Sequence, residues 1–272
     1  MVAGFQGASE GGEITTLGRG GSDTSAVILG VALEAEYVDI FTDVIGVMTA
    51  DPRIVPEAHI LEGLTYTEAA EIIQQGAKVI HDKAMNIARE YRVPLRVRSL
   101  NDEGKGTLIC DIRSMSKEGL RLFSQDRTVY SIAFRKGLAQ FRVKLNGKKE
   151  DNLLMFQLLA NKGISIDLIN LFPDIVAFVV EEGKALRVKE ILEKEGFELT
   201  LIYPCAKISL VGSGMADRPG VVADMVEALR SSKIEILQTS DSHVTISCLV
   251  HATDMEKAIQ VLHRKFQLED IC

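Results

Sequence analysis

The spacing of apolar positions over the first hundred residues predicts helices that alternate with strands. Thr65 and Glu68 have the spacing of a capping box at a helix start, and Gly76 fits the position just after a helix end. The expected elements are helices at about 24–35, between 65 and 76 and at about 82–91, strands at 37–44 and 95–100, and a long loop at 44–58. This alternation favours a mostly parallel sheet with helices on its faces.

The chain opens on an apolar segment, residues 2–7, that runs directly into a polar loop at 8–13. An apolar run in this place is typical of a strand that ends inside a core. We therefore expect residues 2–7 to be the end of a core strand.

A polar, glycine-containing segment at 101–127 predicts a linker after the first region at 1–100. Beyond it, residues 152–171 align without a gap onto residues 222–241, so that Leu159 falls on Leu229 and Ile164 on Ile234. Each copy has the order strand, helix, strand, strand, helix, strand, which predicts two ferredoxin-like modules at 128–204 and 205–272. Duplication of a stable fold explains this repeat as well as a functional role does.

Composition places the chain among soluble, intracellular α/β proteins. Its 272 residues are 46% hydrophobic and 25% charged, with a formal net charge of −7, so we expect neither a nucleic-acid partner nor a membrane partner. No apolar run reaches the roughly 20 residues of a membrane span, and the opening segment lacks the features of a signal peptide. The four cysteines are far apart and are expected to be reduced thiols, as in a cytoplasmic protein.

The spacing of nucleophiles and histidines excludes several kinds of site. The chain contains no G-x-S-x-G motif and no P-loop, which argues against acyl transfer and Walker-type hydrolysis. The five histidines do not have the spacing of metal ligands, so no protein metal site is expected and they are interpreted as structural or exposed.

The segment from Gly18 to Thr24 is the strongest local signal of a binding site. Its glycines allow close backbone approach to a ligand, and the helix that follows offers free N–H groups to an anion. Arg19 has the geometry to bind a carboxylate or phosphate with two hydrogen bonds. A structural turn in which Ser22 or Asp23 caps the helix explains the same residues.

Two further segments carry candidate binding groups. Thr42 and Asp43 follow an expected buried strand, and the carboxyl ends of parallel strands are where open α/β folds bind ligands. Arg53 adds a guanidinium on the long loop, and Lys78 lies in an apolar stretch after the second helix. An exposed loop at Arg53 and a solvated surface charge at Lys78 are the alternatives.

These segments together, VAGFQG, TTLGRGGSDTSA, DIFTDVIGVMTADPR, QGAKVIH and VPLRVRS, resemble the C-terminal half of the kinase domain of the aspartate kinase (aspartokinase) family. The segments GSGMADRPGVVADMVEAL and ILQTSDSHVTISCLVHATDMEKAIQVLHRKFQL resemble the second of that family's paired ACT modules. The resemblance implies a partial amino-acid kinase sheet, carbamate kinase-like, followed by two ACT modules. It also implies that strand 128–134 joins the sheet of the second module.

The resemblance implies the transfer of a phosphoryl group from ATP, as its Mg²⁺ complex, to L-aspartate, giving ADP and 4-phospho-L-aspartate. This is the first step of lysine, threonine, methionine and diaminopimelate synthesis. The residues that match are Asp23 and Lys78 as catalytic groups, Arg19, Gly20, Gly21 and Ser22 at the aspartate, and Thr42, Asp43, Met48, Arg53, Lys78 and Val79 at the nucleotide.

The same resemblance implies feedback by an amino-acid end product, such as lysine, threonine or diaminopimelate, and a homodimer formed through the ACT modules. The residues that match effector contacts are Glu150, Asp151 and Asn152, Asp167, and Gln238, Thr239, Ser240 and Asp241. A plain polar turn explains residues 239–242 equally well.

One departure from the family bears on activity. The Lys-Phe-Gly-Gly segment and the glutamate of the family's N-terminal half do not occur in this sequence. Loss of one cation from the phosphoryl site would raise the activation barrier of the transfer by several kcal/mol, and each ~1.4 kcal/mol slows the reaction about tenfold. We therefore expect residues 1–272 alone to be inactive. The alternative function is a non-catalytic chain that senses an amino acid.

Overall fold

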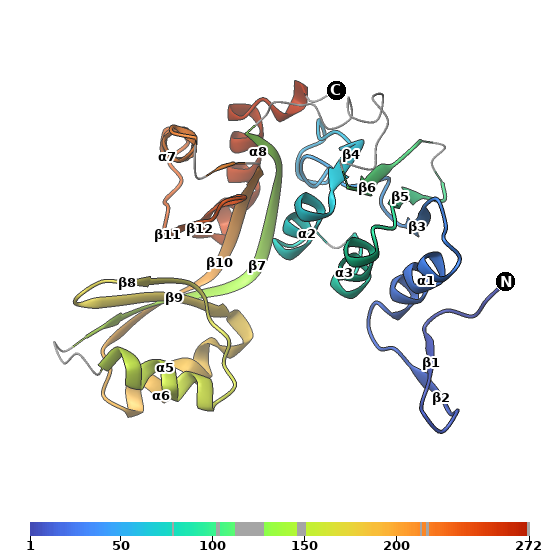
Figure 1. Ribbon diagram of the computed structural model, residues 1–272. Helices are drawn as coiled ribbons and strands as arrows, with labels where there is room; N and C mark the ends of the chain where they lie inside the picture. Colours follow the sequence, from blue (N-terminus) through green and yellow to red (C-terminus); the bar gives the residue numbers. More distant parts are fainter. Residues whose placement is uncertain are drawn as a thin grey trace.

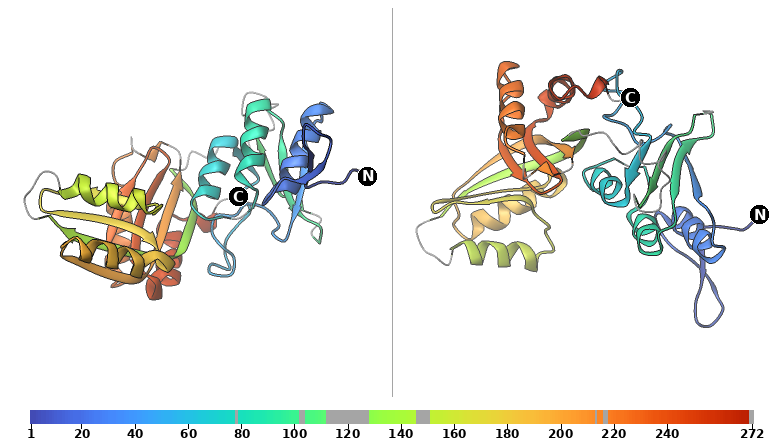
Figure 2. Two further views of the ribbon diagram at one scale, coloured as in Figure 1. Left: turned by 90° about the horizontal axis from the view of Figure 1, so that it is seen from below. Right: turned by 45° about the horizontal axis from the view of Figure 1, so that its top comes forward.

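The computed structural model describes residues 1–77, 79–101, 104–111, 128–145, 151–212, 214–215 and 218–270, apart from the side chains of Asp151 and Asp270. Figure 1 shows two lobes, a first region (residues 1–111) and a second region (residues 128–270), and both views of Figure 2 separate the same lobes. The first region lies beside strands β7 and β10 of the second region, with helix α2 next to β7 (Figure 1).

The sheet of the first region has four strands in the order β3-β5-β6-β4. Its strands are β3 (Val38–Thr42), β4 (Gly63–Thr65), β5 (Leu95–Ser99) and β6 (Thr107–Cys110). Strand β3 is parallel to β5 and β4 is parallel to β6, whereas β5 and β6 are antiparallel, so the sheet is mixed. Strand β6 lies within the segment expected to be a linker at 101–127; of that linker, residues 102–103 and 112–127 are outside the described residues.

The helices of the first region are α1 (Gly21–Ala32), α2 (Tyr66–Gln74) and α3 (Asp82–Tyr91). The predicted capping box of α2 is confirmed: Thr65 Oγ1 accepts from the Glu68 N–H, and the Glu68 carboxylate accepts from the Thr65 N–H. Gly76 follows α2 with φ +128°, as the predicted helix end requires.

The expectation of a core strand at 2–7 is wrong. Strands β1 (Gln6–Ala8) and β2 (Ile14–Thr16) form a two-stranded antiparallel hairpin whose residues are mostly exposed. Phe5 is anchored to α1, since its N–H donates to Ser25 Oγ at 3.1 Å. The segment's apolar residues find few partners there, so its composition misled the prediction.

The second region is one six-stranded antiparallel sheet in the order β11-β12-β10-β7-β9-β8. Its elements are β7 (Val129–Lys144), α5 (Asp151–Asn161), β8 (Asp167–Leu171), β9 (Ile175–Glu181), η2 (Glu182–Lys184), α6 (Ala185–Lys194), β10 (Leu199–Gly212), α7 (Val221–Ser231), β11 (Gln238–Asp241), β12 (Thr245–His251), η4 (Ala252–Asp254), α8 (Met255–Lys265) and η5 (Leu268–Asp270). Figure 1 shows α5 and α6 below β8 and β9, and α7 and α8 packed together beside the upper part of the sheet, with α8 next to β10.

The repeat predicted from the sequence is present in the structure. Helices α5 and α7 begin and end at aligned positions, and strands β9 and β12 do the same. Leu159 and Leu229 are both buried, as are Ile164 and Ile234. The equivalent positions therefore pack in the same way in both modules.

Strands β7 and β10 each pass through both modules. The second half of β7 pairs with β9 and with the start of β10, whereas its first half, residues 129–135, pairs with the second half of β10. The predicted addition of 128–134 to the second sheet is thus confirmed for Val129–Phe134. Among the described residues, η5 and no strand follows the last helix of the second copy, and the first half of β7 pairs with β10 where that strand was expected.

No helix within the described residues is long and apolar enough to cross a membrane. The described cysteines, Cys110, Cys205 and Cys248, are buried free thiols, and burial raises the pKa of Cys110 to about 11 and of Cys248 to about 12. Cys272 lies outside the described residues.

Candidate functional site

The topology of the first region places two helix starts and two strand ends at one edge of the sheet. Helix α1 leads through a short connection into β3, and α3 leads in the same way into β5. The two strands are parallel, with Thr42 opposite Ser99 at their carboxyl ends. A helix that packs back along its strand begins at the carboxyl edge, so the first turns of α1 and α3 lie beside Thr42 and Ser99.

The glycine loop before α1 is built to leave N–H groups free. The residue before the helix, Gly20, has φ +75° and offers no side-chain cap, so neither Ser22 nor Asp23 is the cap, and the helix begins at Gly21 and not at Thr24. Among the described residues the N–H groups of Ser22 and Asp23 have no acceptor. These groups and the positive end of the helix dipole favour an anion there.

Asp23 and Gly20 join this loop to the start of α3. The Asp23 carboxylate accepts from the His81 N–H at 3.2 Å. Gly20 lies so close to the His81 ring that a β-carbon at this position would overlap it. The loop at 18–23 and the segment at 79–82, which are about 60 residues apart in sequence, are therefore in direct contact.

Two cationic side chains, Arg19 and Lys78, are predicted at this edge, and the structure describes only Arg19. Arg19 is exposed and, within the described part of the chain, has no hydrogen bond or ion pair, so its guanidinium is available to a ligand. Lys78 lies outside the described residues, and its neighbour Val79 is half-buried beside the segment that touches Asp23. The predicted catalytic role of Lys78 stays a prediction.

The nucleotide residues predicted on the long loop fall into two groups. Thr42 Oγ1 donates to Asp43 at 3.0 Å. The hydrogen bond with Asp51 raises the pKa of Arg53, and the charge of Asp43 adds to this effect. Arg53 pairs with Asp51 at 2.7 Å, and this hydrogen bond lowers the pKa of Asp51 although burial opposes it. Arg53 is thus an exposed guanidinium held by its own loop and open to solvent on its far side.

Met48 belongs to the other group, because its backbone faces the second region. It forms a bridge with Ile60 across the base of the loop, and its carbonyl accepts from Ser131 Oγ of β7 at 3.0 Å. Its side chain packs against the core. Its predicted nucleotide contact is not tested by these contacts.

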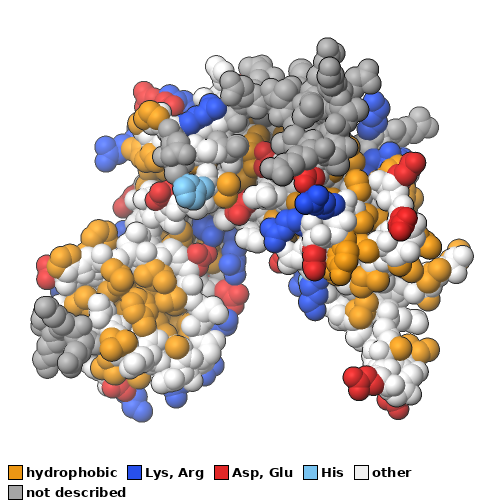
Figure 3. All heavy atoms as spheres, viewed as in Figure 1, with side chains coloured by type: hydrophobic (Ala, Val, Ile, Leu, Met, Phe, Trp, Pro, Cys, Tyr) orange, Lys and Arg blue, Asp and Glu red, His pale blue; other side chains and the backbone are white. Residues whose placement is uncertain are grey.

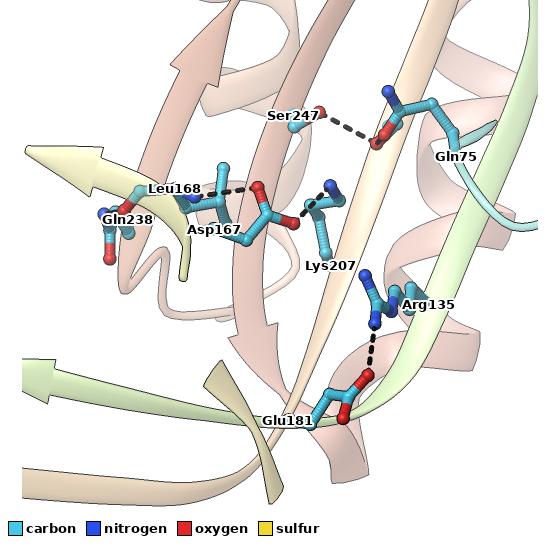
Figure 4. Close-up of polar contacts among 9 residues, drawn as sticks. Gln75, Arg135, Asp167, Leu168, Glu181, Lys207, Gln238 and Ser247 are labelled. Carbon is cyan, nitrogen blue, oxygen red and sulfur yellow. Dashed lines mark hydrogen bonds and ion pairs between the residues drawn. The ribbon is translucent and has the colours of Figure 1, made fainter. Parts of the chain in front are cut away.

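Among the predicted effector residues, Asp167 and residues 238–241 lie on β8 and β11, the two end strands of the sheet order, whereas Asn152 lies on helix α5. Asp167, on β8, pairs with Lys207 of β10 at 2.8 Å, and Figure 4 shows the two side chains pointing toward each other. Thr239, Ser240 and Asp241 are exposed on β11. Glu150 and the side chain of Asp151 are outside the described residues, whereas Asn152 is half-buried in the first turn of α5.

Gln238 already has partners within the protein. Its side-chain amide is buried, donates to Asn170 Oδ1 at 2.7 Å and to the carbonyl of Leu168, and accepts from Gln140 Nε2 at 2.9 Å. These partners belong to β7 and to the β8 edge, so Gln238 connects the second module to the first. A ligand that bound Gln238 would have to displace one of these bonds.

Burial raises the pKa of Asp167, but the hydrogen bond and the charge of Lys207 outweigh it, so the pKa lies below the ordinary value. The partners differ in exposure, since the Lys207 side chain is 11% exposed and that of Asp167 is 40% exposed. Loss of the carboxylate therefore leaves a buried ammonium without a partner, whereas loss of Lys207 leaves a carboxylate that water and the Leu168 N–H still reach.

We expect Asp167→Asn to lower the free energy of unfolding by about 1–2 kcal/mol at pH 7, and Lys207→Met to lower it less. Because the pKa of folded Asp167 is depressed, its stabilisation is present above the ordinary 3.8 and is lost as the pH falls through the folded pKa. Urea unfolding at pH 7 and at about pH 3 measures both effects. Glu198→Gln, in the exposed pair with Lys144, is the control and should change nothing; equal losses in the two Asp167–Lys207 variants would contradict the argument.

Sequence reasoning missed the residues that join the two regions. Thr49 contacts His263 at 3.0 Å. Gln75 Oε1 accepts from Ser209 Oγ at 2.9 Å, and Ser209 Oγ lies 2.8 Å from Ser247 Oγ. Figure 4 shows the side chains of Gln75 and Ser247 pointing toward each other. The sequence signal for these contacts is a polar residue at a position where the hydrophobic pattern of a helix or strand predicts a buried side chain. The described residues contain no group of three or more His, Cys, Asp or Glu side chains that could hold a metal ion.

Comparison with known proteins agrees with this architecture. Residues 1–99 match the model of the amino acid kinase family, and residues 201–264 match that of the ACT domain. Aspartokinase 1 of Bacillus subtilis is 46% identical over 269 residues, which cover 98% of this chain and 66% of that protein. The chain thus spans about two thirds of the length of this curated relative.

Solved structures give the same picture. Aspartate kinase of Clostridium acetobutylicum superposes with a TM-score of 0.85 at 26% identity, over 97% of this chain and 62% of that one. Aspartokinase III of E. coli in complex with aspartate and ADP superposes with a TM-score of 0.75 at 30% identity, over 96% of this chain and 59% of that one. A structure of the same enzyme with lysine and aspartate gives 0.74 at 29% identity, over 97% and 59%. The chain belongs to the aspartokinase family, with an amino acid kinase region followed by two ACT modules.

Proposed function

We propose that this chain takes part in the phosphorylation of L-aspartate by ATP, giving ADP and 4-phospho-L-aspartate, under the control of an amino acid bound by its ACT modules. The observation that carries the proposal is the contact of the glycine loop with the start of α3 through Asp23, Gly20 and His81. It supports a single anion-binding edge built from two helix starts. The E. coli relative whose structure holds aspartate and ADP supports the choice of substrates.

The chemistry of this edge fits phosphoryl transfer. Such a reaction needs positioning and neutralisation of charge on the γ-phosphoryl group more than covalent help. We assign the aspartate substrate to Arg19, Ser22 and the glycines between them, and the nucleotide to Thr42, Asp43, Met48, Arg53, Lys78 and Val79. Asp23 would orient the cationic groups, and Mg²⁺ would enter with ATP and neutralise part of the charge on its phosphates.

The regulatory part of the proposal concerns the second region. We assign an amino-acid effector to the edges that carry Asp167 and residues 238–241, with lysine, threonine and diaminopimelate as candidates. The lysine in the second E. coli structure supports this class of ligand. A homodimer through the ACT modules would cover the exposed side chains of β8 and β11, the end strands of the sheet order. We place the protein in the cytoplasm, where these metabolites are made.

Calorimetry with residues 1–272 tests the proposed substrates. L-aspartate and Mg·ADP should each bind, and Arg19→Gln should weaken L-aspartate roughly 10- to 100-fold, because a charge-assisted hydrogen bond contributes about 1.5–3 kcal/mol. Arg89→Gln is the control: Arg89 is an exposed arginine in the last turn of α3, at the far edge of the sheet. Equal affinities in Arg19→Gln and wild type would remove Arg19 from the site, and absence of Mg·ADP binding would contradict the proposal.

An ADP-release assay on the same sample tests the expectation that residues 1–272 do not turn over. Titration with L-lysine, L-threonine and diaminopimelate in parallel identifies the effector. Effector binding without substrate binding would favour the alternative function, a chain that senses an amino acid without catalysing the reaction.

A further inference from the structure

The loop from 43 to 62, which the proposed function assigns to the nucleotide, is held along one side by the second region. Strand β7 supplies two of the contacts. Ser131 Oγ donates to the carbonyl of Met48 at 3.0 Å, and the Ile132 N–H donates to the carbonyl of Thr49 at 2.7 Å. The loop is thus attached to the start of β7 by its backbone.

Helix α8 supplies two further contacts from side chains. Gln260 Nε2 donates to the carbonyl of Ile54 at 2.9 Å, and His263 Nε2 lies 3.0 Å from Thr49 Oγ1. Thr49 is 0% exposed and His263 is 1% exposed, although 214 residues separate them. A buried pair of side chains therefore joins the loop to the last helix of the second ACT module.

The hydroxyl of Thr49 is the centre of this contact. It accepts from the His59 N–H at 3.1 Å, and the Thr49 N–H donates to the His59 carbonyl at 2.9 Å, so Thr49 also ties the two arms of the loop together. The single proton of the hydroxyl is then available to His263 Nε2, which accepts it as a neutral imidazole. The other ring nitrogen, Nδ1, carries its proton toward Glu269 of η5 at 3.5 Å.

We propose that Thr49 and His263 are positioning residues, and that the second ACT module sets the affinity for the nucleotide through this contact. The role of the loop in binding nucleotide rests on the proposed function. The contact itself is independent of it, because Thr49 holds the two arms of the loop against α8 whatever the loop binds. A shift of α8 would move Thr49, and the expected nucleotide residues Met48 and Arg53 lie one and four positions from it.

Protonation of His263 provides a second way to release the loop. Burial lowers the pKa of His263; Glu269 and Glu57 oppose this and His59 adds to it, while Arg264 borders the hollow of about 300 Å³ beside the ring. The form in which His263 contacts Thr49 therefore binds fewer protons than the form in which this contact is broken. The contact is complete above the ordinary value of 6.5 and weakens as the pH falls below it.

The test compares variants that differ in one polar atom. Thr49→Val keeps the shape of the side chain and removes the hydroxyl, whereas Thr49→Ser keeps the hydroxyl. His263→Gln places an amide near the position of Nε2 and does not titrate, and His263→Leu removes the polar atom. Each variant is measured by hydrogen exchange of the amides at 47–61 and by calorimetry with Mg·ADP.

We expect Thr49→Val and His263→Leu each to weaken Mg·ADP about 10-fold, which corresponds to about 1.4 kcal/mol, and to speed exchange at 47–61. Thr49→Ser and His263→Gln should stay within about 3-fold of wild type, and the double variant Thr49→Val/His263→Leu should lose no more than either single variant. Between pH 7.5 and 5.5, wild type should lose affinity relative to His263→Gln.

The possible outcomes separate the positioning role from the proposed function. Wild-type affinity in Thr49→Val, or an equal loss in Thr49→Ser, overturns the positioning role while the proposed function stands. If wild type does not bind Mg·ADP, the proposed function fails, and the role in nucleotide affinity fails with it. In that case faster exchange in Thr49→Val but not in Thr49→Ser still supports Thr49 as the residue that holds the loop, and equal exchange overturns that as well.

Discussion

Gly20→Ala is expected to abolish most of the binding of L-aspartate and Mg·ADP by this chain. A β-carbon at Gly20 overlaps the ring of His81, and the φ of +75° at this position is strained for any residue with a side chain. The ring has no free space to move into without cost, because its Nδ1 accepts from the Lys83 N–H at 3.3 Å and caps α3. The hydrogen bond from the His81 N–H to Asp23 would be broken as well.

The strain and the overlap together are worth about 2–4 kcal/mol, which corresponds to roughly a 30- to 700-fold loss of affinity. Gly18→Ala is a matched control, since Gly18 has φ +74° and no other atom lies within 4 Å of its β-carbon position. Gly18→Ala should show the effect of backbone strain alone, a loss of about 1–2 kcal/mol in the free energy of binding. Calorimetry with both ligands and circular dichroism of both variants make the comparison. If Gly18→Ala and Gly20→Ala lose the same affinity, the packing of the loop on His81 is not what forms the site.

Gly76→Ala is expected to loosen the first region from the second. Gly76 follows α2 with φ +128°, and its β-carbon would overlap the backbone carbonyl of Phe134 in β7. A backbone oxygen within a paired strand cannot turn aside as a side chain does, so α2 or β7 must shift. The hydrogen bond of the preceding residue, Gln75, to Ser209 would lengthen, and the segment that leads to Val79 would move with it.

We expect the thermal midpoint of Gly76→Ala to fall by roughly 5–15 °C, from a loss of about 2–4 kcal/mol. Gly163→Ala is the control, because Gly163 follows α5 in a similar place with φ +67° and has no atom within 4 Å of its β-carbon position. Calorimetric scanning measures both variants, and Mg·ADP titration shows whether the loss reaches the site. An equal, small decrease in the thermal midpoint of both variants would mean that the backbone near Phe134 can move to accommodate the added β-carbon at little cost.

The helices and the repeat could be predicted because they depend on local patterns. The capping residues Thr65 and Glu68 and the stripe of α3 lie within a few positions of one another, and their spacing is visible without any partner. The same holds for Leu159 and Leu229, which share a position in two copies of one helix. Local periodicity therefore located most elements to within a few residues.

The start of α1 was placed three residues late for a physical reason. Glycine, serine and aspartate have low intrinsic preference for a helix, so the sequence favoured a loop there. In the structure the helix begins at Gly21, where the buried glycine packs against Phe5 and Leu17 in space that no larger residue fits. Tertiary packing outweighed the local preference.

Long-range contacts could not be predicted in this way. Nothing near Thr49 in the sequence identifies His263 as its partner, and the pairing of the first half of β7 with β10 joins residues about 75 positions apart. Such contacts depend on how whole elements dock, which the hydrophobic pattern of one segment does not specify. The anion-binding edge was predictable in its residue types, whereas its attachment to the regulatory sheet was not.

The sharing of β7 and β10 has a consequence for how the ACT pair can move and be dissected. Figure 3 shows a notch between the first module and the first region, so the pair is attached to that region through the second module. Because two continuous strands run through both modules, one module cannot rotate independently of the other. A distortion at β8 is transmitted to β12 as a change in the twist of the shared sheet. A fragment that begins after residue 137 would lack the strand partners of Lys207–Gly212 and would leave that stretch of β10 bare and prone to aggregate. We therefore expect the second module to be stable in isolation only when residues 128–136 are fused to it.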